Sequence, residues 1–352
     1  MPRPGRCLFA VLLLTLTILA APRLSPAADA LPFEPGDSIE ALREKIRLNG
    51  YDFTVGETWV FNLPESQKKN LRSRGAIPSS PPKDAPARLT SLDAAAPLAL
   101  PASFDWRSKG GRSYIGPIKN QGDCGACYAF AAAATAEGTY NVATGRTGAN
   151  CADFSEQYIA FCLGTFGPYF AHFEGCSGAD YDYAELLALT QVGVARESAL
   201  PYTGEQPPGC NSSAYPPLVL FKSWGRAACS DIDAIKAAIM ANGPVDAAVN
   251  VTSAFDAYTG GLYQDNQTGC PGSDCAYTIT NHAIALVGWN DNGDAANNGY
   301  WILRNSWGTS WGEQGYMRIK YGSARVSCSV AYLTYPRQTG DPVRGALKLL
   351  LQ

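Results

Sequence analysis

The chain contains, at residues 121–130, the stretch Gln121-Gly122-Asp123-Cys124-Gly125-Ala126-Cys127-Tyr128-Ala129-Phe130. The alanine run 131–134 follows it, and alanine is the best helix former, so we expect a helix from about Cys127 to Tyr140. Cys127 would lie in the first turn of that helix, directly after a glycine-containing turn. The unsatisfied N–H groups and the dipole at a helix start stabilise an anion, which favours the thiolate form of a cysteine. The stretch therefore predicts that Cys127 is a nucleophile.

Two other interpretations of the Cys124-x-x-Cys127 spacing compete with this one. The first is a redox pair of the thioredoxin type, which is disfavoured because no strand-helix-strand unit surrounds the motif. The second is half of a zinc site, which is disfavoured because no second close pair of Cys or His residues follows.

A cysteine nucleophile needs a histidine partner, and the chain has only His172 and His282. His282 precedes the apolar segment 283–289, which reads as a strand, whereas His172 lies in an irregular stretch and is better explained as a surface or loop residue. Asn305 follows His282 by 23 residues, and a side-chain amide can fix the orientation of an imidazole. A buried histidine satisfied by a backbone group remains the alternative for His282.

These segments, together with Pro101-Ala102-Ser103-Phe104-Asp105-Trp106-Arg107 and Asn305-Ser306-Trp307-Gly308, resemble the papain family of cysteine peptidases from about Pro101 to Pro336. The resemblance implies that Cys127 attacks the peptide carbonyl, that His282 is the general acid and base, and that Asn305 orients His282. It also implies that Gln121 binds the developing oxyanion together with the Cys127 N–H group. Trp307 would cover the contact between Asn305 and His282. Tyr128 departs from the family, which more often has tryptophan there.

The resemblance also suggests a substrate pocket, although ordinary core packing is an adequate alternative for each of its residues. Gly178 and Ala179 would run beside an extended substrate, and Ala179 stands where the family often has glycine. The pocket for the second residue before the cut would be apolar and lined by Tyr181, Ala248, Thr280 and Leu333.

The basic and apolar residues at the N-terminus read as a signal peptide, whose removal takes Cys7 away and leaves ten of the eleven cysteines. The resemblance implies three disulfides: Cys124–Cys176, Cys162–Cys210 and Cys275–Cys328. Cys270 competes with Cys275 for Cys328. Cys151 and Cys229 stay unassigned.

Periodic patterns predict helices at 37–50 and 231–241, and a strand-like alternation at 51–55. Further strands are predicted at 245–249, 283–289, 300–303 and 316–319. The first half of the main body is helical and the second half is rich in strands, which suggests two subdomains with a cleft between them. With the resemblance, we expect an α+β, papain-like fold that has a helical subdomain, a β-barrel-like subdomain and the active site in the cleft.

The N-terminus reads as a secretory signal peptide, because Arg3 and Arg6 precede the apolar stretch 8–21 and small residues follow. We divide the chain into a signal peptide at 1–30, a short pro-region with a Pro/Ala/Ser-rich linker at 31–100, a peptidase domain at 101–336 and a tail at 337–352. The pro-region differs from the family's long helical propeptide. The protein should reach a secreted, periplasmic or lysosome-like compartment.

Composition bounds the function further. The 352 residues are 46% hydrophobic and 17% charged, with a formal net charge of −3, which fits a globular protein and gives no reason to expect nucleic acid. We expect polypeptide substrates, no metal or organic cofactor, no membrane span after signal removal, a monomer, and inhibition by the chain's own pro-region. An acyl transferase and a non-catalytic binder remain rivals. We expect an endopeptidase, although no recognisable insertion distinguishes it from an exopeptidase.

Overall fold

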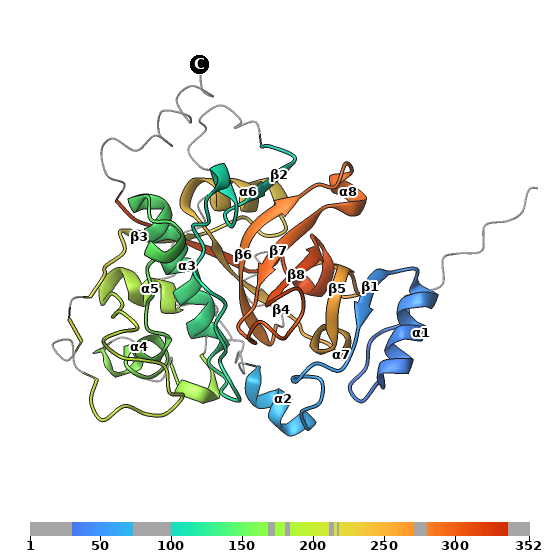
Figure 1. Cartoon of the computed structure of the whole chain (residues 1–352), viewed down its shortest axis with the longest axis horizontal. Coiled ribbons are helices and arrows are strands. Elements are labelled where there is room, and N and C mark those ends of the chain that lie inside the picture. Colours follow the sequence, from blue (N-terminus) through green and yellow to red (C-terminus); the bar gives the residue numbers. More distant parts are fainter. Residues whose placement is uncertain are drawn as a thin grey trace, which may run out of the picture. The chain divides into compact units, whose positions relative to one another are not determined.

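The computed structural model of the chain describes residues 30–72, 100–167, 173–179, 184–210, 215–216, 218–270 and 280–336 (Figure 1). The following predictions lie outside these residues: the signal peptide, the linker up to residue 99, His172, Tyr181, Cys275 and the tail 337–352. Within the described part of the chain, no helix has both the length and the apolar character that crossing a membrane requires.

Eight α-helices are described: α1 (Ile39–Asn49), α2 (Glu65–Leu71), α3 (Cys127–Thr144), α4 (Glu156–Phe161), α5 (Ala184–Gln191), α6 (Ile232–Asn242), α7 (Ser253–Asp256) and α8 (Ala295–Asn298). The central helix α3 is buried almost all round, which its alanines permit because their small side chains let neighbouring elements approach closely. Figure 1 shows α3, α4 and α5 grouped on one side of strands β4 to β8, with β3 beside them.

The strands are β1 (Asp52–Val55), β2 (Ser103–Asp105), β3 (Ser223–Arg226), β4 (Val245–Val249), β5 (Tyr258–Tyr263), β6 (His282–Asn290), β7 (Tyr300–Arg304), β8 (Tyr316–Lys320) and β9 (Val330–Thr334). They form a sheet in the order β1-β5-β8-β7-β6-β4-β9-β3, and β2 pairs with β6 beside this path. Among these strands, β5 and β8 pair in parallel and the other pairs are antiparallel.

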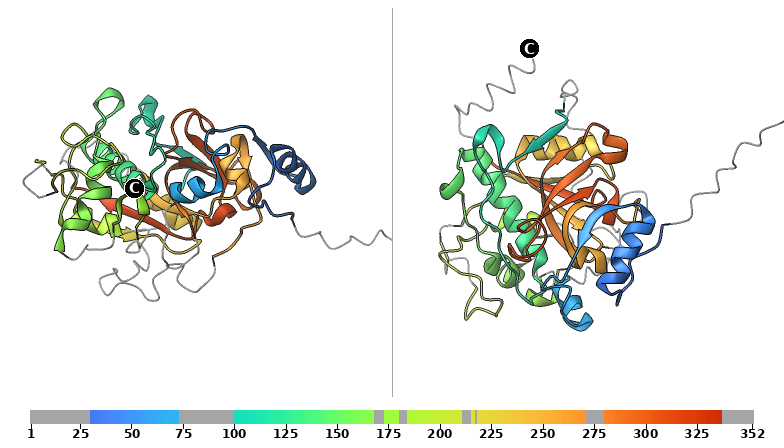
Figure 2. Two further views of the ribbon diagram at one scale, coloured as in Figure 1. Left: turned by 90° about the horizontal axis from the view of Figure 1, so that it is seen from below. Right: turned by 45° about the vertical axis from the view of Figure 1, so that its right-hand side comes forward.

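The predicted N-terminal helix is confirmed as α1. Ser38 accepts a hydrogen bond from the Ala41 N–H group at 3.2 Å, which caps the helix start. Gly50 ends the helix in the left-handed conformation, with φ 67°, which glycine adopts without steric cost. The following strand β1 pairs with β5, so that residues before the predicted domain boundary extend the sheet of the main body (Figure 2).

The division into a helical and a strand-rich part is confirmed. One buried cluster contains large side chains of the sheet, such as Trp289 and Trp301, and a second cluster surrounds α3. The helix α3 packs against β4, β6 and β9, so the two parts meet along this helix. Together the helices and the mixed sheet form the α+β fold that the sequence predicted.

The disulfides Cys124–Cys176 and Cys162–Cys210 are present as expected. The prediction of a Cys275–Cys328 bond is wrong, because Cys328 is bonded to Cys270 with 5.4 Å between their Cα atoms. Position along the sequence could not separate two cysteines five residues apart, since the path of the loop decides which one reaches Cys328. Cys229, which had no assignment, is also disulfide-bonded.

Candidate active site

Cys127 is the first residue of α3, and its side chain is fully buried. The N-cap residue of α3 is Ala126, which has no side-chain oxygen and makes no capping hydrogen bond. The positive end of the helix dipole beside Cys127 is therefore not neutralised by a capping side chain at this position. Cys127 forms no disulfide, whereas Cys124 is bonded to Cys176. Because Cys124 is held in that bond, the Cys124-x-x-Cys127 pair acts neither as a redox pair nor as half of a zinc site in this structure.

His282 begins β6, and its imidazole contacts Asn305. The distance from His282 Nε2 to Asn305 Oδ1 is 2.8 Å, and both residues are buried. The same Oδ1 accepts a hydrogen bond from the Ser306 backbone N–H at 2.8 Å, which identifies this atom of the amide as the acceptor. Nε2 of His282 is therefore the donor, and Nδ1 is the ring nitrogen left to exchange a proton. Among the described residues, Nδ1 has no hydrogen-bond partner.

The Trp307 indole lies against this pair, with its ring centroid 4.7 Å from that of the imidazole. Trp307 is fully buried, and it packs in turn on Phe255 and Trp311. Excluding water lowers the local dielectric, which strengthens the hydrogen bond between His282 and Asn305.

Cys127 begins α3 and His282 begins β6, at the boundary between helices and strands. The two elements pack against each other, and Ala283, which follows His282, belongs to the same apolar cluster as Cys127. The fold thus brings Cys127 and His282, which are 155 residues apart in sequence, to one region of the molecule.

Gln121 is tied to the loop that carries Asn305. Its Oε1 accepts a hydrogen bond from Ser306 Oγ at 2.6 Å, and its backbone N–H donates to the Ser306 carbonyl at 2.8 Å. The amide Nε2 donates to the carbonyl oxygens of Cys124 at 2.8 Å and Leu71 at 3.0 Å. The Leu71 carbonyl, at the end of α2, therefore accepts a hydrogen bond from the Gln121 side-chain amide. That amide is the group predicted from the sequence to bind the oxyanion.

The segment 58–72, which lies before the predicted domain boundary, covers this site. Trp59 Nε1 donates to the Trp307 carbonyl at 2.8 Å, and the Arg72 guanidinium forms an ion pair with Asp256. The Asp256 side chain is 1% exposed, and that of Arg72 is 15% exposed. The covering segment is thus anchored on the strand-rich side by a buried charge pair.

The same segment approaches the glycine of the cysteine motif. A Cβ atom built on Gly125 would lie 2.4 Å from the carbonyl oxygens of both Asn70 and Cys176, closer than real contacts allow. Glycine at this position therefore lets two backbone carbonyls approach the turn before Cys127.

Burial, together with the positive charge of Arg72, lowers the pKa of His282 from 6.5 to a net value of about 4. The hydrogen bond to Asn305 and the negative charge of Asp256 raise this pKa but do not compensate. In the covered site the imidazole is consequently neutral at neutral pH. Burial also raises the pKa of Asp256, whereas the charge of Arg72 lowers it.

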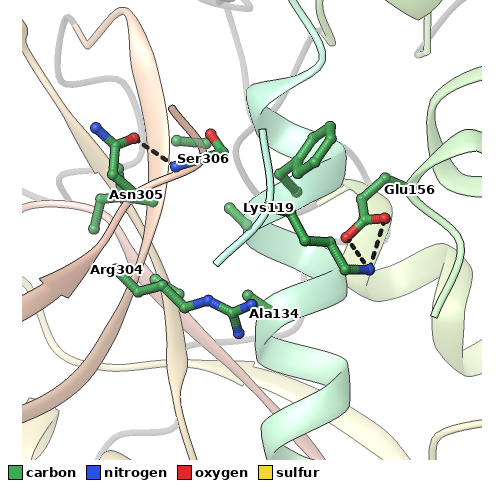
Figure 3. Close-up of a pocket in the computed structure, with 11 residues that line it drawn as sticks. Lys119, Ala134, Glu156, Arg304, Asn305 and Ser306 are labelled. Carbon is green, nitrogen blue, oxygen red and sulfur yellow. Dashed lines mark hydrogen bonds and ion pairs between the residues drawn. The ribbon is translucent and has the colours of Figure 1, made fainter. Parts of the chain in front are cut away.

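A small cavity of about 10 Å³, close to the volume that one water molecule needs, lies between α3 and β6. Figure 3 shows Asn305, Ser306 and Arg304 on one side of it and Lys119 with Glu156 on the other. Lys119 lies two residues before Gln121, and Arg304 directly precedes Asn305. The cavity therefore adjoins both chain segments that carry polar residues of the site.

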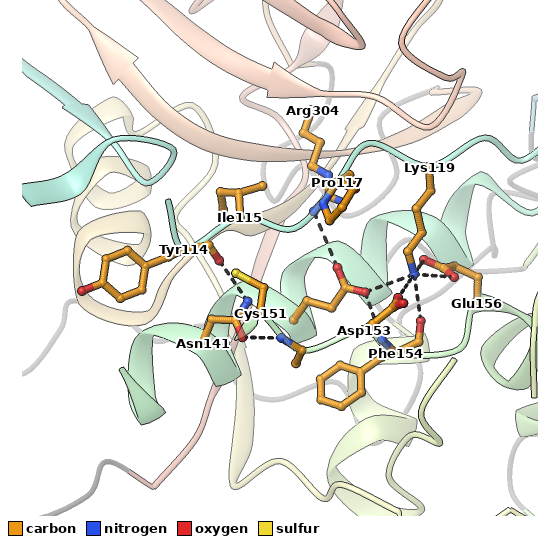
Figure 4. Close-up of polar contacts among 12 residues, drawn as sticks. Tyr114, Ile115, Pro117, Lys119, Asn141, Cys151, Asp153, Phe154, Glu156 and Arg304 are labelled. Carbon is orange, nitrogen blue, oxygen red and sulfur yellow. Dashed lines mark hydrogen bonds and ion pairs between the residues drawn. The ribbon is translucent and has the colours of Figure 1, made fainter. Parts of the chain in front are cut away.

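An ion-pair network holds these two segments (Figure 4). Lys119 Nζ lies 2.7 Å from Glu156, 2.6 Å from Asp153 and 3.2 Å from Glu137, and Arg304 lies 3.7 Å from the other oxygen of Glu137. Burial lowers the pKa of Lys119, but Glu137 and Glu156 raise it above its ordinary value. Burial raises the pKa of Glu156, and Lys119 opposes this shift. We expect the network to keep Gln121 and Asn305 in register with α3.

The residues predicted to line the substrate pocket lie in several elements, and most of them are buried. Ala179 and Leu333 are buried in the apolar cluster that includes Cys127, and Ala248 pairs with Ala283 across β4 and β6. Thr280 is partly buried before β6, and Gly178 has φ 110°, a conformation that favours glycine. Their role as a pocket stays a prediction.

Several residues at the site were not identified from the sequence. Gln121 is contacted by Ser306 and Leu71, and the charges of Arg72 and Asp256 act on His282. These contacts exist only because distant segments of the chain meet. Ser306 was quoted with Asn305, but a lone serine gives no signal of a bond to a glutamine 185 residues away. Tyr128, which stands where the family more often has tryptophan, ties α3 to neighbouring segments. Its hydroxyl lies 3.1 Å from the Ala160 carbonyl oxygen and 3.0 Å from that of Gly175.

Comparison with known proteins identifies the family. Residues 100–336 match the papain family cysteine proteases, so the chain belongs to this family. It is 32% identical over 235 residues to fruit bromelain from Ananas comosus, a match that covers 66% of this chain and 59% of the bromelain. The chain thus spans less than two thirds of the length of that relative.

Two solved structures resemble the fold. Digestive procathepsin L 3 from the larval midgut of Tenebrio molitor has a TM-score of 0.65 and 24% identity, and the match covers 84% of this chain and 87% of that one. The Carica candamarcensis cysteine protease CMS1MS2, in complex with E-64, has a TM-score of 0.54 and 30% identity, with coverage of 67% and 100%. The likeness to the first structure includes the region before residue 100, because the match extends beyond the length of the family domain.

Proposed function

We propose that the chain is the precursor of a cysteine peptidase that hydrolyses peptide bonds through a thioester on Cys127. The observation that carries the proposal is the buried hydrogen bond between His282 Nε2 and Asn305 Oδ1, which leaves Nδ1 available for proton exchange. Membership of the papain family supports the same reaction class.

In the proposed reaction, His282 takes the proton of the Cys127 thiol, and the thiolate attacks the carbonyl carbon of the substrate. The negative oxygen that forms is bound by the Gln121 side-chain amide and the Cys127 N–H group. The imidazolium then gives its proton to the leaving amine as the C–N bond breaks. Water attacks the thioester with His282 as base, and collapse of that intermediate releases the acid and restores Cys127. Asn305 holds the imidazole orientation through both steps.

We further propose that residues 31–100 are a pro-region that inhibits the enzyme until they are removed. The Leu71 carbonyl accepts a hydrogen bond from the Gln121 amide, the group that the oxyanion requires. Arg72 helps to lower the pKa of His282 to about 4, which disfavours the imidazolium that must accompany a thiolate. The pro-region would therefore both cover the site and keep its acid-base residue neutral.

The proposed route to the active protein follows the domain limits predicted from the sequence. Residues 1–30 would direct export, and residues 31–100 would be lost by cleavage near Leu100. The processed protein, with a peptidase domain at 101–336 and a tail at 337–352, would act as a monomer. Three disulfides in the described residues favour an oxidising destination such as a secreted, periplasmic or lysosome-like compartment. N-terminal sequencing of the exported and processed protein tests both cleavage sites.

The central experiment compares full-length and processed chains with quenched peptides and identifies the products by mass spectrometry. We expect hydrolysis by the processed chain, little by the full-length chain, and none by Cys127→Ala. Cys151→Ala is the matched control, because Cys151 is the other cysteine outside a disulfide in the described residues and is only partly buried. Near-normal hydrolysis by Cys127→Ala would refute the mechanism, and equal activity before and after processing would refute inhibition by the pro-region.

A further inference from the structure

Asp256 presents a buried carboxylate beside the catalytic pair, and the proposed mechanism does not use it. It is the last residue of α7 and follows Phe255, whose ring lies 6.5 Å from the His282 imidazole and 5.8 Å from the Trp307 indole. The Asp256 backbone carbonyl is fixed by the Trp311 indole N–H at 3.1 Å. The carboxylate therefore has a defined position on the imidazole side of the site.

The present occupant of this position is an arginine. The Arg72 guanidinium pairs with Asp256 Oδ2, and Arg72 directly follows Leu71, whose carbonyl is hydrogen-bonded to the Gln121 amide. When a backbone carbonyl is hydrogen-bonded to the Gln121 amide, as that of Leu71 is, the side chain of the next residue therefore reaches Asp256. Asp256 is close enough to His282 to affect its pKa, which agrees with this placement.

The pair is not saturated with hydrogen bonds. Within the described residues, Asp256 Oδ1, Arg72 Nε and Ser253 Oγ are buried and have no hydrogen-bond partner. They border a cavity of about 300 Å³ between the covering segment and the main body, which Asn250 and Gln267 also line. Asp256 thus keeps acceptor capacity beyond the contact to Arg72, as recognition of a forked guanidinium requires.

Removal of the pro-region would take Arg72 away and leave Asp256 without this cation. Asp256 would then accept hydrogen bonds again, and a guanidinium that reaches it forms charge-assisted bonds with both carboxylate oxygens. In the proposed reaction the imidazolium protonates the leaving amine, which places the residue after the scissile bond on the His282 side. That is the side on which Asp256 lies.

We propose that Asp256 selects substrates with arginine, and to a lesser degree lysine, directly after the scissile bond. This inference rests on the proposed peptidase function. Arginine should be favoured over lysine because its planar fork can bind both carboxylate oxygens, whereas an ammonium group acts as a point charge.

The experiment measures kcat/KM of the processed enzyme for quenched peptides that differ only in the residue after the cut. The variable residue is arginine, its neutral analogue citrulline, lysine or leucine, and mass spectrometry verifies the cut. We expect arginine to be preferred over citrulline by about tenfold to a hundredfold, the range for a hydrogen-bonded charge pair. Asp256→Asn should remove this preference while hydrolysis of the leucine peptide continues.

Asp291→Asn is the matched control variant. Asp291 also pairs with a cation, Lys236 at 2.6 Å, but it follows the far end of β6, about 30 Å along the strand from His282. The arginine preference should persist in this variant. If Asp256→Asn does not fold, Asp256→Ser and the wild-type comparison of arginine with citrulline still test the idea.

Equal rates for the arginine and citrulline peptides in the wild type would overturn the proposal, and so would an arginine preference that survives in Asp256→Asn. In either case, Asp256 would serve only to hold the pro-region. Failure here is distinguishable from failure of the peptidase proposal, because the leucine peptide reports Cys127-dependent hydrolysis independently of any basic side chain.

Discussion

Acidification should destabilise the covered precursor through His282. Its pKa in the folded chain is about 4, because of burial and the charge of Arg72, against an ordinary value of 6.5. Between these two values the unfolded chain binds a proton at His282 and the folded chain does not. The free energy of unfolding therefore falls as pH falls through this window. The contribution is fully present above pH 6.5 and is lost progressively towards pH 4.

The size of the effect follows from the width of the window. One pKa unit corresponds to about 1.4 kcal/mol, so a shift from 6.5 to about 4 represents about 3 kcal/mol, most of which should be lost by about pH 4.5. This is a large share of the stability of an ordinary domain. Asp256 and Glu156 act in the opposite direction, since burial raises their pKa values and the folded state binds their protons first.

Urea unfolding of two full-length variants isolates the histidine. Cys127→Ala removes the proposed nucleophile and keeps His282, and Cys127→Ala with His282→Gln also removes the titrating group. The difference in unfolding free energy between the variants should change by about 2 to 3 kcal/mol between about pH 7 and about pH 4.5. A difference that is constant with pH would refute the reasoning, because it would mean that His282 binds a proton equally well in the folded and unfolded chains.

Three further predictions concern the site and its frame. Asn305→Ala in the processed enzyme should lower kcat/KM by about tenfold to a hundredfold, because His282 loses its orienting acceptor; an unchanged value would contradict that role. Gln121→Ala should lower kcat by about 10²- to 10³-fold in steady-state assays, whereas a change in KM alone would contradict an oxyanion role. Replacing Cys124 and Cys176 together with alanine should lower the unfolding free energy by about 4 kcal/mol, given their separation of 52 residues, and urea unfolding that matches the wild type would contradict this.

Local patterns were sufficient for the elements that their own residues stabilise. The spacing of Ile39, Leu42 and Ile46, with Ser38 before them and Gly50 after them, specified α1 at both ends. The short helices α2 and α7 were missed, because a helix of a few residues has little propensity of its own and forms through tertiary contacts.

The burial of charged residues could not be predicted from local sequence patterns either. Lys119, Glu137, Glu156 and Arg304 read as ordinary solvent-exposed charges in sequence, since charged residues are seldom buried unless they are paired. They come from α3, α4, the end of β7 and the chain before α3, and only tertiary packing brings these segments into one network. The choice of Cys270 over Cys275 for Cys328 likewise depends on the course of a loop.

By itself, the sequence determined the family, the α+β fold and the residue types of a cysteine peptidase site, because the motif at 121–130 and the segments of His282 and Asn305 carry their chemistry locally. The tertiary structure alone decided what surrounds that site. Arg72 and Asp256 are 184 residues apart, and neither belongs to a recognisable motif. Their pairing, the covering of Gln121 by Leu71 and the neutral state of His282 follow from burial and proximity, which exist only once the chain has folded.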